Sequence, residues 1–358
     1  MDTHPLNITT LGKILCIRGK KLYRWYKDVL SGFNTEEGQK ELHRHDLKVE
    51  GKVKEKVISV PILKPENIGK HMAIDEKQIG EEMHSIVTNR ETGKIAILAQ
   101  TLKSSQLSEI METYEEKGYE VETVTRDLSN NYNSFCKWSF PFAKHIADKF
   151  HILSQLLDAG QSVRVRYRQE LLRKRRMAYE MHKQIEKERK KQCKLDGLNY
   201  EPKKFTYQEE RFKNGDTSLE LLARSRYLLY KYKHQWTDSQ KERADILFKE
   251  FPEIKTAYDL ACEFRIWYKK ENIGKNRITM ETALNQWYVK VEHVEIDEML
   301  NFKSMVELNQ DIIINYFEKG YTNAIAENMN SRIQRFIVSN QGTRDRDFFY
   351  FRLRNYFA

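Results

Sequence analysis

Three acidic residues that lie far apart in the chain, Asp75, Asp127 and Glu327, have local sequences suited to holding a metal ion. Asp75 ends the apolar run at 72–75, and Asp127 closes the run at 121–127; both runs are typical of strands. Glu327 lies in a segment with helical periodicity. If the fold brings the three carboxylates together, they form a two-metal site for phosphoryl transfer.

The residue types also indicate which cation such a site would hold. Carboxylates that lie close together repel one another unless cations neutralise them. Two Mg²⁺ ions about 3.5–4 Å apart would remove that repulsion, one activating the attacking oxygen and the other the leaving oxygen. Hard oxygen ligands suit Mg²⁺, with Mn²⁺ as a substitute, rather than zinc.

Each acid also has a structural interpretation. An Asp at the end of a strand commonly caps a turn, and a chain with 52 acidic residues offers many triplets. A single Glu among amides is also what an ordinary polar helix face looks like. Asp148 is a further candidate, and for Asp148 with His151 a structural role stands beside metal ligation.

The elements that would position Asp75 begin with three short strands. Residues 72–79, 83–90 and 94–102 have strand composition, and both connections between them contain glycine at hairpin length. The sequence therefore predicts three antiparallel strands.

A crossover through a helix would then bring the strand of Asp127 back to the sheet. Residues 104–117 have helical spacing, with Gly118 as a stop, and a right-handed crossover returns the next strand parallel to a neighbour. A short helix at 132–138 and a fifth strand at 144–150 follow. This order predicts an α/β fold with a ribonuclease H-like mixed sheet.

The segment around Glu327 predicts an amphipathic helix. At about 100° per residue, four apolar side chains share one face and four polar ones the opposite face. The apolar set is Ile325, Met329, Ile333 and Phe336, and the polar set is Asn323, Glu327, Asn330 and Gln334.

The chain divides into four expected regions. Residues 1–69 predict a small helical region, compatible with a DNA-binding helix-turn-helix and equally with a plain helical hairpin. Residues 70–152 would form the first part of the core, and residues 153–318 a large basic helical insertion between the fifth strand and the Glu327 helix. Residues 319–358 would return to the core as C-terminal helices.

Positive charge is concentrated in one segment. The net charge is +10, and residues 161–194 contain 13 Lys or Arg against four Glu, above an approximate apolar stripe. A solvated helix face is one interpretation; a polyanion partner, with DNA or RNA first, explains so concentrated an excess better. The residues expected to contact phosphates are Arg164, Arg166, Arg168, Arg173, Lys174, Arg175 and Arg176.

Composition excludes several classes of protein. No run approaches the roughly 18 apolar residues of a membrane span, and the N-terminus has no hydrophobic signal segment. The four cysteines are scattered without a C-x-x-C pair, which argues against a disulfide scaffold or a zinc ribbon. We therefore expect a reducing cytoplasm.

Six short motifs, in order over about residues 65–358, carry a resemblance to a known family. They are Ile74-Asp75-Glu76, Thr125-Arg126-Asp127 followed by Tyr132, Ala147-Asp148-Lys149-Phe150-His151, Leu222-Ala223-Arg224-Ser225-Arg226-Tyr227-Leu228-Leu229, Asn323-Ala324-x-Ala326-Glu327-x-x-Asn330 and Phe348-Phe349-Tyr350-Phe351-Arg352-Leu353. Together they resemble the DDE transposases of bacterial insertion sequences, of the ISL3-like class and its two-gene, Bacteroidetes-type subgroup.

The resemblance implies roles for particular residues and partners. Asp75, Asp127 and Glu327 match the family's catalytic acids, and Arg332 preserves a charge that relatives supply with Lys near phosphate. Full-length relatives carry an N-terminal zinc-ribbon and helix-turn-helix region, for which this chain has no zinc ligands. In the two-gene subgroup a small, separately encoded protein resembles that region, so such a partner is expected to contribute to recognition of the element ends.

The main hypothesis is a Mg²⁺-dependent DNA transposase. It would cleave DNA at the ends of an insertion sequence, and the freed 3′-hydroxyl would attack target DNA. We expect a dimer or higher oligomer on DNA by analogy, in the bacterial cytoplasm with the nucleoid and without a membrane partner. The alternatives are a non-catalytic DNA-binding protein of transposase descent and a ribonuclease H-like nuclease.

Overall fold

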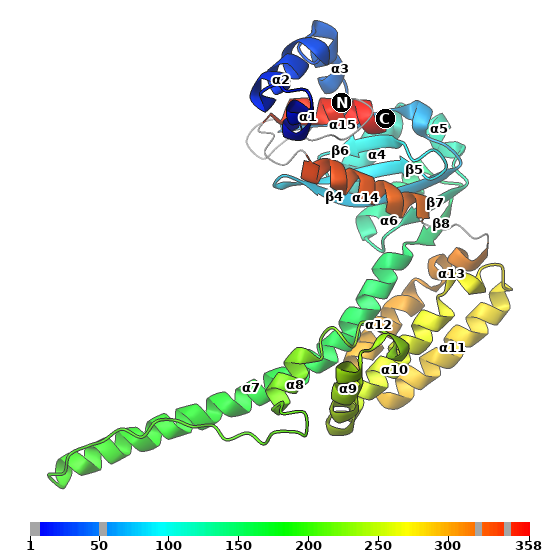
Figure 1. Cartoon of the computed structure of the whole chain (residues 1–358). Coiled ribbons are helices and arrows are strands. Elements are labelled where there is room, and N and C mark those ends of the chain that lie inside the picture. The colour runs from blue at the N-terminus through cyan, green and yellow to red at the C-terminus, as the bar shows by residue number, and fades with distance from the viewer. Residues whose placement is uncertain (1–7, 50–55, 319–323, 340–344) are drawn as a thin grey trace. The chain divides into compact units, whose positions relative to one another are not determined.

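The computed structural model describes residues 8–49, 56–318, 324–339 and 345–358 (Figure 1). The chain divides into two compact units. One consists of Met1–Lys149 together with Asp311–Ala358 and contains the sheets, and the other is Phe150–Gln310 and is built of helices.

A six-stranded mixed sheet lies at the centre of the first unit. Its order is β3-β6-β5-β4-β7-β8, with antiparallel neighbours from β3 to β4 and parallel neighbours from β4 to β8. The predicted antiparallel strands, and the predicted parallel return of the Asp127 strand beside the Asp75 strand, are confirmed. The strands are β3 (Ile62–Leu63), β4 (His71–Ile79), β5 (Glu82–Asn89), β6 (Ile95–Ala99), β7 (Thr123–Arg126) and β8 (Lys144–Ala147).

Three strands lie in the N-terminal region, which the sequence predicts to be mainly helical. β3 adds a sixth strand to the predicted five by pairing with β6, and β1 (Leu47–Val49) pairs with β2 (Lys56–Ile58) in a separate two-stranded sheet. Strands of two or three residues are too short to show an alternating pattern. At the other end of the sheet, the strand predicted at 144–150 stops at Ala147, because helix α7 begins at Lys149.

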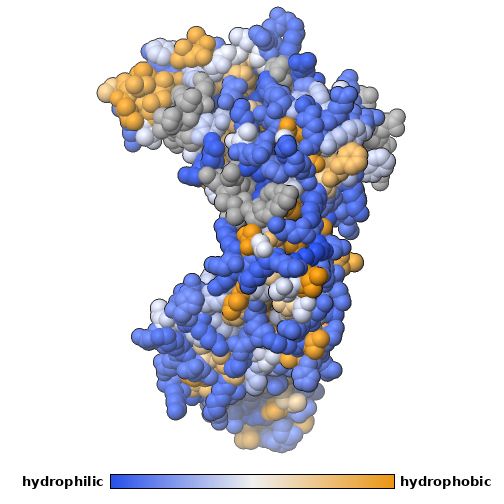
Figure 2. Space-filling view, turned by 90° about the vertical axis from the view of Figure 1, so that its right-hand side faces the viewer, coloured by the Kyte–Doolittle hydropathy of each residue, from blue (hydrophilic) through white to orange (hydrophobic). Residues whose placement is uncertain are grey.

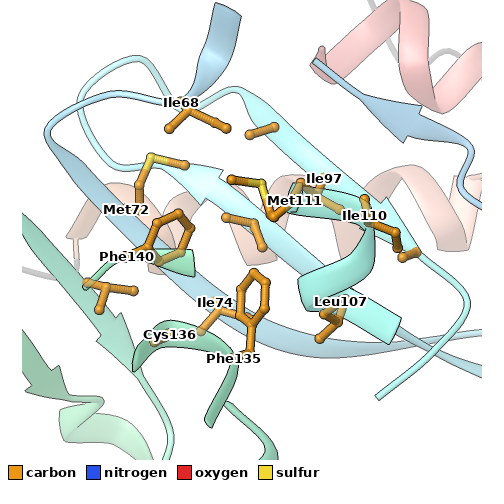
Figure 3. Packing of buried hydrophobic residues seen from close by; sticks show 14 of the residues in the cluster. Ile68, Met72, Ile74, Ile97, Leu107, Ile110, Met111, Phe135, Cys136 and Phe140 are labelled. Carbon is orange, nitrogen blue, oxygen red and sulfur yellow. The ribbon is translucent and has the colours of Figure 1, made fainter. Parts of the chain in front are cut away.

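Helices α4 (Ser104–Glu112), α5 (Glu115–Tyr119) and α6 (Asn130–Ser139) follow the crossover positions that the sequence predicts. Figure 3 shows the buried side chains of α4 and α6 packed together with those of the sheet. This hydrophobic cluster includes Met72 and Ile74 of β4, Leu107, Ile110 and Met111 of α4, and Phe135 and Cys136 of α6.

The sequence predicts that Gly118 ends the preceding helix, and this prediction is wrong. The helix predicted at 104–117 is broken after Glu112, and α5 continues past Gly118 to Tyr119. A Cβ atom at Gly118 would lie 1.9 Å from the carbonyl oxygen of Ser139. Glycine is required here because the backbones of α5 and α6 approach so closely.

The opposite side of the sheet packs against the C-terminal helices α14 (Ala324–Ser339) and α15 (Arg346–Phe357). Ile333 and Phe336 of α14 are buried in one cluster with Ile79 of β4 and Ile86 of β5. The prediction that these two α14 residues face the core is confirmed, and Gln334 is exposed as predicted.

The N-terminal helices precede the sheet, and residues between Tyr23 and Leu42 belong to the same core. These helices are α1 (Ile8–Ile14), α2 (Gly19–Trp25), a π-helical turn (Tyr26–Leu30) and α3 (Glu36–His43). The ring of Phe348 on α15 lies 5.6 Å from that of Tyr23, 5.8 Å from Tyr26 and 5.1 Å from Phe33. An ion pair between Lys27 and Asp345 adds to this contact.

Helices also make up the segment between β8 and α14. Helix α12 ends at Leu308 and α13 begins at Gln310, with Asn309 between them. The elements are α7 (Lys149–Leu195), α8 (Ser218–Arg224), α9 (Asp238–Glu250), α10 (Pro252–Trp267), α11 (Arg277–Val294), α12 (Asp297–Leu308) and α13 (Gln310–Glu318), with 3₁₀ turns at Lys233–Gln235 and Lys270–Asn272 and a further one at Pro65–Asn67 in the sheet unit.

α7 has 47 residues, which corresponds to a length of about 70 Å. Its buried residues all lie between Ile152 and Arg164. The predicted apolar stripe is therefore confirmed at Leu156 and Val163 and wrong at Met181 and Ile185, which are exposed.

The molecular surface in Figure 2 is mostly hydrophilic. Hydrophobic residues gather at the upper end of this face, at the height of the N-terminal helices in Figure 1. Among the described residues, no helix combines the length and the apolar character that a membrane span requires.

Candidate active site

Asp75 and Asp127 occupy matching positions along two neighbouring parallel strands. Ala73 of β4 pairs with Thr125 of β7, and two further residues along each chain lead to Asp75 and Asp127. Residues at one register level share a face of the sheet, and neighbouring strands lie about 4.8 Å apart. Both aspartates are half-buried. Strand pairing thus brings these two acids to adjacent positions.

Asp148 stands at the same level on the next strand. Arg126 pairs with Ala147, and a 2.8 Å bond from the Asp148 N–H to the Arg126 carbonyl continues the ladder past both strand ends. Asp148 is half-buried. His151, which the sequence groups with it, lies on α7, where its ring is 5.9 Å from that of Phe150.

Both candidate aspartates also have a local structural contact. Oδ1 of Asp127 accepts a 2.8 Å hydrogen bond from the Ser129 N–H, and Oδ1 of Asp75 accepts one of 2.8 Å from the Glu76 N–H. The first bond closes a turn between β7 and α6, as expected for an Asp at a strand end. Asp127 therefore has a structural role whatever else it binds.

The buried side chain of Arg126 joins the end of β7 to two other elements. Nη1 donates to the Asp127 carbonyl at 2.8 Å, Nη2 donates to Oδ1 of Asn133 on α6 at 2.8 Å, and Nε donates to Nδ1 of His145 on β8 at 3.3 Å. Burial lowers the pKa of the Arg126 guanidinium. Burial, followed by the charge of Arg126, also lowers the pKa of His145 to about 4, so that the ring is neutral and can accept this bond.

Tyr132 has a buried hydroxyl on the face of the sheet opposite to that of Asp75. The Ser85 hydroxyl donates to the Thr101 carbonyl at 2.6 Å, which leaves Tyr132 to donate to Ser85 Oγ at 3.2 Å. Desolvation raises the pKa of Tyr132, and the charges of Glu76, Asp127 and Asp75 raise it further. Tyr132 thus stays protonated within electrostatic range of the acids.

Helix α14, which carries Glu327, packs on the sheet face that carries Asp75. Asp75 is paired across the sheet with Ile86, and residues paired in this way share one face. Ile86 packs in one cluster with Ile333 and Phe336 of α14. The side chain of Glu327 itself lies outside the described residues, so convergence of the three carboxylates stays a prediction.

The donor set fits a hard cation. Asp75 and Asp127 supply carboxylate oxygens, the ligands that Mg²⁺ and Mn²⁺ prefer. Among the side chains that the structure describes, no three His, Cys, Asp or Glu residues form a group that could hold a metal ion. A metal held at Asp75 and Asp127 would therefore need a further ligand such as Glu327.

Two of the arginines predicted to contact DNA are used within the protein. Arg164 is buried, with Nε donating to Gln161 Oε1 at 2.7 Å and Nη1 donating to the Leu222 carbonyl at 2.8 Å. Arg166 is ion-paired with Glu253 at 2.7 Å and Glu298 at 2.9 Å, and the hydrogen bonds that it donates to Glu298 and Glu253 raise its pKa. Neither presents its guanidinium freely to a phosphate.

The other predicted phosphate-binding residues are more accessible. Arg168 is half-buried, and the four-residue run from Arg173 to Arg176 is fully on the surface of α7. Arg332 is half-buried on α14, with its guanidinium 5.7 Å from the ring of Tyr356 and 5.5 Å from that of Phe357. The run at 173–176 is the strongest candidate for contact with a polyanion.

Arg126, His145 and Ser85 lie near the candidate acids, and the sequence assigned a role to none of them. A charged residue inside the otherwise apolar and hydroxyl-bearing run of β7 could have marked Arg126, because such a residue needs hydrogen-bond partners when buried. Nothing in the sequence marks His145 or Ser85, since each is identified by a partner distant in the chain.

Comparison with known proteins identifies one family. A family model described as a transposase matches residues 72–353, more than half of the chain. The matched segment contains Asp75, Asp127 and Glu327. No curated protein matches the chain.

Proposed function

Because the chain belongs to the ISL3-type transposase family, we propose that it is a Mg²⁺-dependent DNA transposase that cuts insertion-sequence ends and joins them to target DNA. The observation that carries this proposal is the matching position of Asp75 and Asp127 on neighbouring parallel strands. Helix α14, with Glu327, packs on the same sheet face.

A ribonuclease H-like assignment of the core is part of the proposal. It is supported by three antiparallel strands followed by two parallel ones, each reached through helices. In such an arrangement β4 and its parallel neighbour β7 carry their acidic residues at the same height along the sheet.

Asp75 and Asp127 would hold the metal ions, and Glu327 would complete the ligand set. When bound, two Mg²⁺ ions supply a nucleophilic oxygen and stabilise the leaving oxygen of an in-line displacement. The two half-buried aspartates lie at matching positions on neighbouring strands. Arg126 donates to the main-chain carbonyl of Asp127, and the Ser129 N–H donates to its carboxylate.

DNA would be held in part by α7. The exposed residues Arg173, Arg175 and Arg176 offer three cations within about one helical turn. Neutralising phosphates in this way makes affinity fall steeply with salt. The proposal includes a dimer or higher oligomer on DNA and a small partner protein that contributes to end recognition.

The test is nicking and strand transfer on supercoiled DNA that carries the element ends, with and without Mg²⁺. We expect Asp75→Asn, Asp127→Asn and Glu327→Gln each to abolish the metal-dependent reaction while DNA binding is kept. The matched control is Glu81→Gln, which changes an exposed acid in the turn between β4 and β5.

Unchanged activity in any of the three acid variants would contradict the site. DNA binding without cleavage by the wild type, even with the partner protein, would favour a non-catalytic protein of transposase descent. Preferential cleavage of an RNA–DNA hybrid would favour a ribonuclease H-like nuclease.

A further inference from the structure

The outer part of α7, residues 165–195, forms an arm that none of the other helices buries. No residue of α7 beyond Arg164 is buried. The chain returns along one side of the arm: the Lys203 N–H donates to Glu186 at 2.9 Å, Tyr200 donates to Glu186 at 2.9 Å, and the ring of Phe205 lies 5.2 Å from that of Tyr179. At the base of the arm Arg166 pairs with Glu253 and Glu298. Farther out, Met177, Met181 and Ile185 are exposed among the described residues.

The open surface has two distinct faces. At about 100° per residue, Met177 and Ile185 lie within about 40° of Met181. These three large apolar side chains are 66%, 49% and 60% exposed for Met177, Ile185 and Met181 respectively. The basic face lies on the opposite side of the helix and consists of Arg176, Lys183, Lys187, Lys190 and Lys194.

One oppositely charged pair flanks the apolar face symmetrically. Lys174 is seven residues before Met181 and Glu188 is seven residues after it, so each lies within about 20° of Met181 around the helix. Neither makes an ion pair within the part of the chain that the structure describes, and both are exposed. Their charges remain available to a partner.

We propose that this apolar face binds the same face of a second copy of the chain, as an antiparallel helix pair with its two-fold axis at Met181. Met181 then meets the partner's Met181, and Met177 meets the partner's Ile185. Lys174 of each copy stands opposite Glu188 of the other. A two-fold interface of this kind is self-complementary.

Charge selects this occupant and this orientation. In a parallel pair Lys174 would face Lys174 and Glu188 would face Glu188, and like charges at such positions repel. In the antiparallel pair both contacts are attractive. The basic faces, which lie on the far sides of the two helices, remain free for DNA.

The contact is small, and its strength follows from its size. Three apolar side chains per copy bury less surface than the roughly 1,200 Å² at which stable interfaces begin. The isolated pair is therefore weak, and it becomes stronger when two copies are held on one DNA molecule, where their effective concentration is high.

Disulfide cross-linking tests the geometry without DNA, metal or turnover, so its outcome is separate from that of the proposed function. Native Cys16, Cys193 and Cys262 are first replaced by Ser in the full chain. Met181→Cys should then form a disulfide-linked dimer under mild oxidation, at least tenfold faster than Lys183→Cys on the opposite face. Met177→Cys alone should not, because antiparallel copies of this residue are about 12 Å apart.

A charge exchange tests the pairing in sedimentation equilibrium. Lys174→Glu and Glu188→Lys should each weaken association about tenfold, since each replaces two attractive contacts per dimer with repulsive ones. The double variant should restore it, and Lys183→Glu should leave it unchanged.

Three results would overturn the proposal. The first is cross-linking of Met181→Cys no faster than that of Lys183→Cys, the result expected if this face binds a different protein. The second is equal cross-linking of Met177→Cys and Met181→Cys, which indicates a parallel pair. The third is failure of the double charge exchange to restore association.

Discussion

The guanidinium of Arg126 donates a 2.8 Å hydrogen bond to the main-chain carbonyl of Asp127. The same side chain reaches Asn133 on α6 and His145 on β8. One buried arginine therefore ties the end of β7, where a candidate catalytic acid lies, to the elements on both sides of it.

Arg126→Met should lower the free energy of unfolding by about 1–3 kcal/mol, because it leaves the Asp127 carbonyl, Asn133 and His145 without their shared donor. It should also raise the Mg²⁺ concentration needed for half-maximal nicking, since Asp127 loses its support. Urea unfolding and a Mg²⁺ titration measure the two effects. Lys137→Met, on the exposed side of α6, is the control and should change neither; a stability loss without any change in the Mg²⁺ requirement would limit Arg126 to a structural role.

Because His84 is buried, we expect the protein to lose stability in acid. Its ring is fully buried, with Nε2 2.7 Å from the Tyr350 hydroxyl and Nδ1 3.2 Å from the Glu82 carbonyl, and burial lowers its pKa to about 4. Between pH 6.5 and about 4 the unfolded chain binds a proton that the folded chain does not. Protonation of His84 therefore does not affect the free energy of unfolding above pH 6.5. Below that pH it lowers the free energy of unfolding, by up to about 3 kcal/mol as the pH approaches 4.

The measurement is the urea unfolding free energy of wild type and His84→Gln at several pH values between 4.5 and 7.5. The variant should show a shallower decline on acidification, with the remaining slope due in part to His145, whose pKa is also about 4. Parallel curves for the two proteins would show that His84 titrates normally.

The exposed basic run on α7 should determine the salt dependence of DNA binding. Replacing Arg173, Arg175 and Arg176 together by Gln should reduce the slope of log affinity against log salt by up to about 2.7, or 0.9 for each lost phosphate contact. Fluorescence anisotropy with duplex DNA at a series of salt concentrations measures this slope.

Arg164→Gln is the matched comparison for that variant. Arg164 is buried and donates to the Leu222 carbonyl, so its loss should leave the salt slope unchanged and cost about 1–3 kcal/mol of stability. A reduced slope for Arg164→Gln together with an unchanged slope for the triple variant would reverse the assignment of the DNA-binding residues.

Phe348 should be essential for the attachment of the N-terminal helices. Its ring is fully buried and contacts Tyr23, Tyr26 and Phe33. Phe348→Ala should cost about 3–5 kcal/mol and make the N-terminal helices sensitive to limited proteolysis. Val29→Ala, at a residue that is 73% exposed, should stay within about 0.5 kcal/mol of wild type; protection of the N-terminal helices in Phe348→Ala would contradict this attachment.

Local sequence predicted most elements of the sheet unit. The glycine-containing hairpins at 80–82 and 91–93 and the strand composition of β4 and β5 are properties of short windows, and the structure confirms the antiparallel pairing that they predict. The break between α4 and α5 was not predicted, because Gly118 is required by the carbonyl of Ser139, which belongs to a different helix.

Burial along α7 also could not be predicted from local sequence. Val163 and Met181 both belong to one apolar stripe in the sequence, yet Val163 is fully buried and Met181 is exposed. Periodicity identifies a face of a helix, but it does not tell how far along the helix other elements reach.

The sequence by itself determined the order of the strands from β4 to β8, the concentration of positive charge and the choice of Asp75, Asp127 and Glu327 as candidate acids, because periodicity, turn residues and motifs are local. Only the tertiary structure decided that Asp75 and Asp127 stand at one level on adjacent strands, that Arg126 supports the second of them, and that Arg164 is buried while Arg173 is exposed. Strand register and burial depend on contacts between segments distant in the chain, and such contacts leave no mark in any single segment.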